Sequence, residues 1–133
     1  AERAGVSPPT ALRRVRHLRE SGLIERTVAL LDEDRLAALR GHGLTAIAEV
    51  TLDRQGAEHQ QAFEHRAVQE AAVQCCWRMA AGPDFVLMLR VRDMPAWQAL
   101  TERLFTQDAN VRNLRSFFVT RRAKFNPAVP LEP

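Results

Sequence analysis

The 133-residue chain is long enough for one ordinary domain or two small ones. Its composition, with 46% hydrophobic and 26% charged residues, is that of a globular protein and excludes a disordered tail. No apolar run reaches the length of a membrane span and no signal-peptide pattern opens the chain, so we expect a cytoplasmic protein. The net charge of +3 lies within residues 1–26, which hold six arginines and three glutamates. Residues 27–133 have no net charge, with thirteen basic and thirteen acidic side chains. This distribution predicts a polyanionic partner for the N-terminal segment.

Residues 7–22, SPPTALRRVRHLRESG, predict a short, capped, arginine-rich helix. Ser7 fits the N-cap, Pro8 the first helical position, and Gly22 the left-handed residue after the last turn. One face carries an apolar stripe, and the opposite face, led by Thr and Arg near the helix N-terminus, suits a DNA major groove. The stripe consists of Ala11, Leu12, Val15 and Leu18. The residues predicted to bind DNA are Ser7, Pro9, Thr10, Arg13, Arg14, Arg16 and His17. The alternative is a solvated basic face.

The segment before this helix, AERAGVS, is typical of the end of another helix, with Gly5 at its C-terminus and Val6 turning inward. Helix, glycine-containing turn and basic helix together form a helix-turn-helix. Such a unit needs a further helix to cover its underside, and residue 1 falls inside the expected second helix. We therefore expect residues 1–26 to be a helix-turn-helix domain whose first helix is missing from this sequence.

The stretch AERAGVSPPTALRRVRHLRESGLIERTVALLD resembles the helix-turn-helix of the Lrp/AsnC (feast/famine) family of transcriptional regulators. The likeness rests on the Ser-Pro opening, the Arg13-Arg14 pair and the Leu-x-x-x-Gly-x-Ile exit at residues 18–24, and it continues to the end of the chain. It implies a winged helix-turn-helix, double-stranded DNA as partner, and an amino acid or related metabolite as effector. It also implies homodimers that gather into tetramers or octamers.

Residues 27–43, TVALLDEDRLAALRGHG, are predicted to be the linker between two domains. Val28 and Leu30 indicate a short strand. The acidic start of DEDRLAALRGHG then predicts a helical turn that ends at Gly41 and Gly43.

Residues 44–133 are predicted to form an effector-binding and oligomerisation domain. Their pattern indicates strands at 44–52, 73–80, 84–91 and 111–125, with helices at 57–71 and 94–105, the second capped by Asp93. The order βαββαβ predicts an α+β, ferredoxin-like fold with an antiparallel sheet and both helices on one face. Alternation places Ala46, Ala48, Val50 and Leu52 in the core, and helical spacing adds Phe63, Ala67, Ala71, Trp97, Leu100 and Leu104.

The sheet face opposite the helices is predicted to be apolar. Its side chains include Val86, Met88, Phe117 or Phe118, and one of Cys76 or Trp77. Because so apolar a face needs a partner, the sequence predicts sheet-to-sheet dimerisation. The effector domains of the family that this chain resembles associate in that manner.

The turn AAGPDF at residues 80–85 is a second candidate site. In Lrp/AsnC relatives this turn often reads Gly-x-Tyr-Asp and lies near the effector between dimers; Asp84 and Phe85 match, whereas Ala81 and Pro83 depart from Gly and Tyr. The resemblance implies backbone donors for a carboxylate and an Asp84 carboxylate for an amino group, with hydroxyls from the last strand. The implied effector-binding residues are Ala81, Gly82, Pro83, Asp84, Ser116 and Thr120. The alternative is a plain β-turn in which Asp84 bonds its own backbone.

No enzyme, cofactor or metal signature stands out in the sequence. The adjacent Cys75 and Cys76 point to opposite faces of a strand, so neither a mutual disulfide nor joint metal ligation is expected, and at least one should be buried. Two alternatives to a regulator stay open: a small-molecule-binding or assembly protein without DNA binding, and a tetrapyrrole-processing enzyme of related fold. The intact basic helix favours the regulator.

Overall fold

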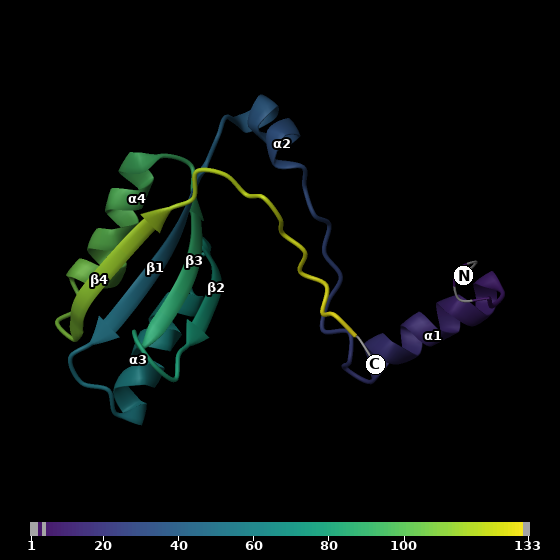
Figure 1. The fold of residues 1–133 in the computed structure, drawn as a ribbon. Helices are drawn as coiled ribbons and strands as arrows, with labels where there is room; N and C mark the ends of the chain where they lie inside the picture. Colours follow the sequence, from purple (N-terminus) through teal and green to yellow (C-terminus); the bar gives the residue numbers. More distant parts are fainter. Residues whose placement is uncertain (1–2, 4, 132–133) are drawn as a thin grey trace. The chain divides into compact units, whose positions relative to one another are not determined.

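The computed structural model describes residues 3 and 5–131, and the chain divides into two compact units, Ala1–Glu33 and Asp34–Pro133 (Figure 1). The division lies inside the segment 27–43. The helix end predicted at residues 1–4 lies largely outside the described residues. Within the described part of the chain, every helix is too short or too polar to cross a lipid bilayer.

The N-terminal unit contains helix α1, Pro8–Glu20, as predicted. The Ser7 hydroxyl oxygen accepts a hydrogen bond from the Thr10 backbone N–H, and Gly22 ends the helix with a φ of 84°. A positive φ is costly for residues that carry a Cβ, which explains glycine at this position. No residue of α1 is buried, and 60% of Leu12 in the apolar stripe is exposed.

The predicted strand at Val28 and Leu30 is wrong, because residues 25–32 have no regular structure and both side chains are exposed. A strand forms only where a neighbour pairs with its backbone N–H and C=O groups, and in the described sheet no strand pairs with this segment. The predicted helical turn is confirmed as α2, Glu33–Arg40, which is followed by Gly41 with a φ of 78°.

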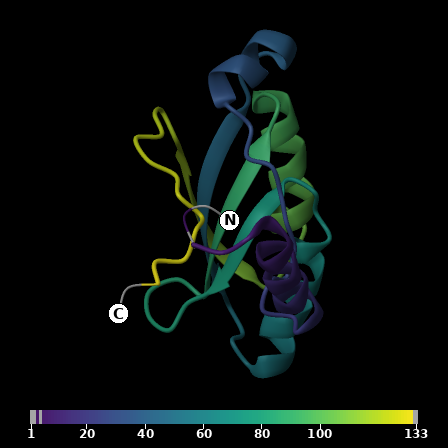
Figure 2. The ribbon, with the colours of Figure 1, turned by 90° about the vertical axis from the view of Figure 1, so that its right-hand side faces the viewer.

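The C-terminal unit has the predicted ferredoxin-like βαββαβ arrangement. Its strands are β1 (Leu44–Leu52), β2 (Val73–Arg78), β3 (Phe85–Val91) and β4 (Val111–Phe118), in the order β2-β3-β1-β4 with every neighbouring pair antiparallel. Helices α3 (Ala57–Val68) and α4 (Met94–Thr101) cover the same face of the sheet (Figure 2).

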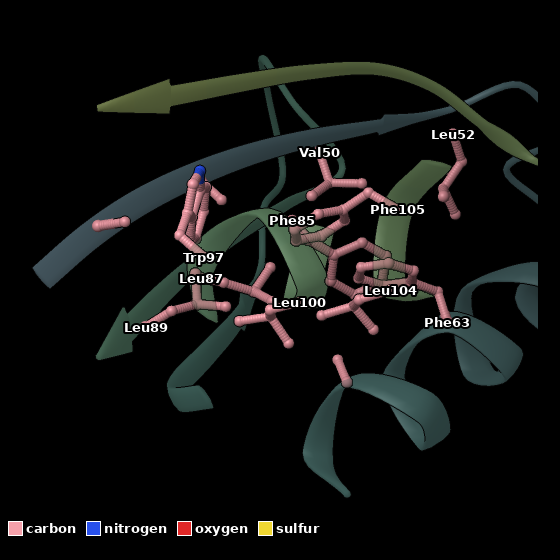
Figure 3. Packing of buried hydrophobic residues seen from close by; sticks show 13 residues of the cluster. Val50, Leu52, Phe63, Phe85, Leu87, Leu89, Trp97, Leu100, Leu104 and Phe105 are labelled. Atoms are coloured by element: carbon pink, nitrogen blue, oxygen red, sulfur yellow. The ribbon is translucent and has the colours of Figure 1, made fainter. Parts of the chain in front are cut away.

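The hydrophobic core lies between this face and the two helices (Figure 3). The four β1 residues that alternation places inward, Ala46, Ala48, Val50 and Leu52, are all fully buried. The rings of Phe63 on α3 and Phe85 on β3 lie 4.9 Å apart between centroids. Since such packing joins elements distant in the sequence, the core fixes the position of both helices on the sheet.

Helix α3 and strand β2 are shorter in the structure than predicted from the sequence. Helix α3 stops at Val68, not residue 71, since the chain turns there into β2; Ala71, predicted to be in the core, is exposed. Strand β2 ends at Arg78. After α4 the chain continues as one π-helical turn, η1 (Glu102–Thr106). The wider π turn lets the consecutive residues Leu104 and Phe105 both be buried.

Strand β4 ends at Phe118, whereas the prediction extended it to residue 125 and placed Thr120 on it. The Val119 N–H donates to the Thr45 carbonyl oxygen at 2.9 Å, close to the start of β1. Beyond this point the edge strand has almost no β1 backbone left to pair with. Ser116 therefore lies within the sheet and Thr120 just outside it.

The strand register decides which side chains occupy the face without helices. One apolar row crosses all four strands there: Cys75, Met88, Ile47 and Phe117. Trp77 pairs with Val86 in the next row, whereas Cys76 packs against the core and Phe118 meets the Trp97 ring edge-on at 5.4 Å. The predicted apolar face is thus confirmed, with Trp77 and Phe117 as its members.

The two cysteines lie on opposite faces, as predicted. Partial burial raises the pKa of both thiols above the ordinary value, which lowers the fraction of reactive thiolate at neutral pH. Cys76 behaves as a small hydrophobic residue beside the core.

Candidate nucleic-acid interface and ligand site

Three polar side chains form a hydrogen-bonded series along the first turns of α1. Ser7 Oγ donates to Thr10 Oγ1 at 2.9 Å, and Arg13 Nη2 donates to the same Thr10 oxygen at 3.2 Å. The residues are spaced at i and i+3, which brings them onto one side of the helix. The Arg13 guanidinium is therefore held against the helix and still exposed, with further N–H groups available to a partner.

The other predicted DNA-binding residues, Pro9, Arg14, Arg16 and His17, are all exposed on the same helix. All seven residues predicted to bind DNA therefore lie on α1 or at its N-cap, within residues 7–17. A helix N-terminus with an arginine fork beside it can donate hydrogen bonds to phosphates and to base edges. Arg19 is engaged differently, since its Nη2 donates to Thr27 Oγ1 at 3.1 Å in the segment that follows α1.

The turn between β2 and β3, residues 79–84, is anchored by backbone bonds at its base. The Met79 N–H donates to the Asp84 carbonyl, and the Asp84 N–H donates to the Val50 carbonyl, both at 2.9 Å. Gly82 has a φ of 78° and no heavy atom within 4 Å of the position that a Cβ would occupy. The tip of the turn is therefore open to solvent while its base is fixed to β1.

The Asp84 carboxylate also bonds to β1 and to the loop after it. Its Oδ2 accepts the Leu52 N–H at 2.7 Å and the Gln55 side-chain N–H at 3.2 Å. The partner is thus a different strand, not the backbone of its own turn as the β-turn alternative expected. Gln55 is not among the residues predicted from the sequence, because a lone Gln after a strand carries no local signal of a contact made 29 residues away.

We predict that Asp84→Ala destabilises the protein by about 1–3 kcal/mol, because the backbone N–H of the buried residue Leu52 loses its acceptor. Asp84→Asn keeps an oxygen that can accept from this N–H, so this variant should lose clearly less stability than Asp84→Ala. Urea unfolding of the parent and both variants measures the difference. Equal stability of the parent and Asp84→Ala would contradict this role of the carboxylate.

The six predicted effector-binding residues do not all meet within one chain. Asp84 lies beside Val50 near the end of β1, Ser116 pairs with Ala48, and Thr120 follows the contact with Thr45 near the β1 start. Thr45 and Val50 are five residues apart on a strand, roughly 17 Å at 3.3 Å per residue. Ala81, Gly82, Pro83 and Asp84 form one group, and Thr120 lies towards the other end of the sheet.

Two family models match the chain. The Lrp/AsnC ligand binding domain matches residues 45–129, and a winged helix-turn-helix DNA-binding model matches residues 1–25. The first match covers the sheet unit and the second ends just after α1.

Known proteins and structures agree with these matches. The chain is 31% identical to the Bkd operon transcriptional regulator of Pseudomonas aeruginosa, over 98% of this chain and 83% of that protein. It resembles the crystal structure of an AsnC family transcriptional regulator from Agrobacterium tumefaciens, with a TM-score of 0.82 and 25% identity over 98% and 82% of the two chains. A transcriptional regulator from Neisseria meningitidis, solved in complex with L-Met, gives a TM-score of 0.81 and 25% identity over 98% and 81%.

Proposed function

Because this chain belongs to the Lrp/AsnC family of transcriptional regulators, we propose that α1 reads DNA through the Arg13 face while the sheet unit senses an amino acid. The domains are residues 1–26 for DNA, 27–43 as linker, and 44–133 for effector binding and oligomerisation. The observation that carries the DNA role is the Ser7–Thr10–Arg13 series on an exposed, capped helix.

In this proposal Arg13 or Arg14 presents a guanidinium fork to a guanine, and Pro9 and Thr10 meet base edges or thymine methyl groups. Ser7, Arg16 and His17 bond to phosphates and set the register of the helix on the duplex. The hydrogen bond from Arg13 to Thr10 supports this division, because it restricts the Arg13 side chain before DNA arrives.

The proposed effector site is the turn at residues 80–84, completed in the assembly by Ser116 and Thr120 of a neighbouring chain. Both bonds to the Asp84 carboxylate reach Oδ2, so Oδ1 is the oxygen that would accept an amino group. The open backbone around Gly82 would donate to the carboxylate of the ligand. The Neisseria meningitidis complex with L-Met supports an amino acid as the class of effector.

The apolar row on the open sheet face, Cys75, Met88, Ile47 and Phe117, supports a homodimer formed face to face by two sheets. Trp77, exposed by 48%, extends this face. Dimers place two α1 helices on two half-sites, and their association into tetramers or octamers would bring neighbouring turns 80–84 together. Effector binding then shifts the population of assemblies and so the affinity for the operator.

We expect the protein to act in the cytoplasm as a regulator and not as an enzyme. The test is binding of the full chain to a duplex from its own upstream region, over a salt series, with and without pooled amino acids. A steep loss of affinity with salt that one amino acid shifts would support both halves of the proposal. Weak binding that salt leaves unchanged in every condition would contradict it.

A further inference from the structure

The Asp84 side chain continues the hydrogen bonding between β1 and β3 beyond their last paired residues, Val50 and Phe85. The Asp84 backbone N–H donates to the Val50 carbonyl oxygen at 2.9 Å, and its Oδ2 accepts the Leu52 N–H at 2.7 Å. Because Leu52 is fully buried, this bond attaches the carboxylate to the fixed end of β1. Within the described part of the chain, both hydrogen bonds to the carboxylate reach Oδ2, which leaves Oδ1 for a ligand.

Gln55 makes the second of these bonds. Its Nε2 lies 3.2 Å from Asp84 Oδ2 and 3.4 Å from the Leu52 carbonyl oxygen. Both neighbours are acceptors, so the orientation of the amide is determined: the amide oxygen in that place would face two other oxygens. The two N–H groups of the Gln55 amide are therefore both used to hold the carboxylate against β1.

The loop that carries Gln55 is itself held in place. The Asn110 side chain accepts the Arg54 N–H at 2.8 Å and donates to the Arg54 carbonyl oxygen at 3.0 Å. The backbone carbonyl of Asn110 accepts the Asp53 N–H, also at 2.8 Å. Gln55 follows directly, and Gly56 after it is the N-cap of α3. The position of Gln55 is thus determined by β1, by α3 and by the turn before β4, although the residue is exposed.

Holding one oxygen of a carboxylate restricts the direction of the other. Ordering an exposed glutamine and an aspartate costs side-chain entropy during folding. A ligand ammonium group that arrives afterwards meets an acceptor already in place, so less entropy is lost on binding.

We propose that Gln55 is a positioning residue of the effector site. It holds the Asp84 carboxylate through Oδ2, so that Oδ1 accepts the ammonium group of an α-amino acid. This inference rests on the proposed function, which places the effector at residues 80–84, and it adds a residue from the loop between β1 and α3 to that site.

The test titrates each of the twenty standard amino acids into the full-length parent by calorimetry, and those that bind into two Gln55 variants. Gln55→Met keeps the size of the side chain but loses both N–H groups, so the affinity should fall by about 3- to 10-fold. Gln55→Lys keeps donors for Asp84 Oδ2 and for the Leu52 carbonyl oxygen. It places a positive charge beside the ligand ammonium group, so the affinity should fall by about 10-fold or more.

Gln98→Lys adds the same charge on the exposed side of α4 and is the matched control, which should bind as the parent does. Thermal unfolding separates positioning from a structural role. Because Gln55→Lys keeps its bonds to β1, its melting temperature should stay near that of the parent while its affinity falls. A glutamine that served only the fold would leave the affinity of this variant unchanged.

Affinity equal to that of the parent in either Gln55 variant would overturn the inference, as would an equal loss in Gln98→Lys. A lower melting temperature of Gln55→Lys alongside its loss of affinity would also overturn it, because the effect would then be structural. In each of these cases, amino-acid binding by the parent would still support the proposed function. If the parent binds none of the twenty amino acids, the proposed effector role fails and this inference fails with it.

Discussion

Met88→Glu is expected to disrupt the proposed dimer and to give a monomer in solution. Met88 lies in the apolar row between Cys75 and Ile47, and a symmetric dimer would bury two carboxylates without a partner. Since Met88 is on the face opposite the core, the single chain should still fold. Sedimentation equilibrium or light scattering measures the change in mass.

The same variant should bind an operator with two half-sites about 10²–10⁴ times more weakly, because linked half-site binding is lost. Gln98→Glu adds the same charge on the exposed side of α4 and is the matched control, which should keep the mass and affinity of the parent. A Met88→Glu protein with the mass of the parent would show that the open sheet face is not the dimer contact.

Arg13→Ala should weaken operator binding by about 5- to 150-fold, the equivalent of roughly 1–3 kcal/mol for one bidentate contact to a base. The preference for the base pair that Arg13 reads should disappear at the same time. Fluorescence anisotropy with the operator and with single-base variants of it measures both effects.

Arg13→Lys separates base reading from charge at this position. Lysine keeps the positive charge but not the planar fork, so the salt dependence should remain near that of the parent while base discrimination falls. An Arg13→Ala protein with the affinity and sequence preference of the parent would rule out the reading role and leave the solvated basic face as the explanation of α1.

Local features of the sequence were enough to predict most elements of the fold. The caps at Ser7 and Asp93 and the alternation through β1 are signals carried by a few consecutive residues, and each is present in the structure. The strand predicted at Val28 and Leu30 is wrong because its formation depends on a contact that is not local. An alternating apolar pattern forms a strand only when a second strand satisfies its backbone, and the local sequence contains no information about that partner.

The sequence by itself determined the family, the βαββαβ order, the amphipathic helix α1 and an apolar sheet face, because periodicity and capping act over less than about fifteen residues. Only the tertiary structure decided which of Cys76 and Trp77, and which of Phe117 and Phe118, lies on that face. Strand register sets those choices, and one residue of slip reverses them.

Tertiary structure also decided the partners of Asp84. The sum over residues 27–133 is zero, but strand pairing brings Arg90 and Arg92 near Arg121, which comes from a later segment of the chain. A sequence gives the amount of charge in a segment. The pairing of antiparallel strands decides where that charge gathers, because it brings the end of one strand beside the start of the next.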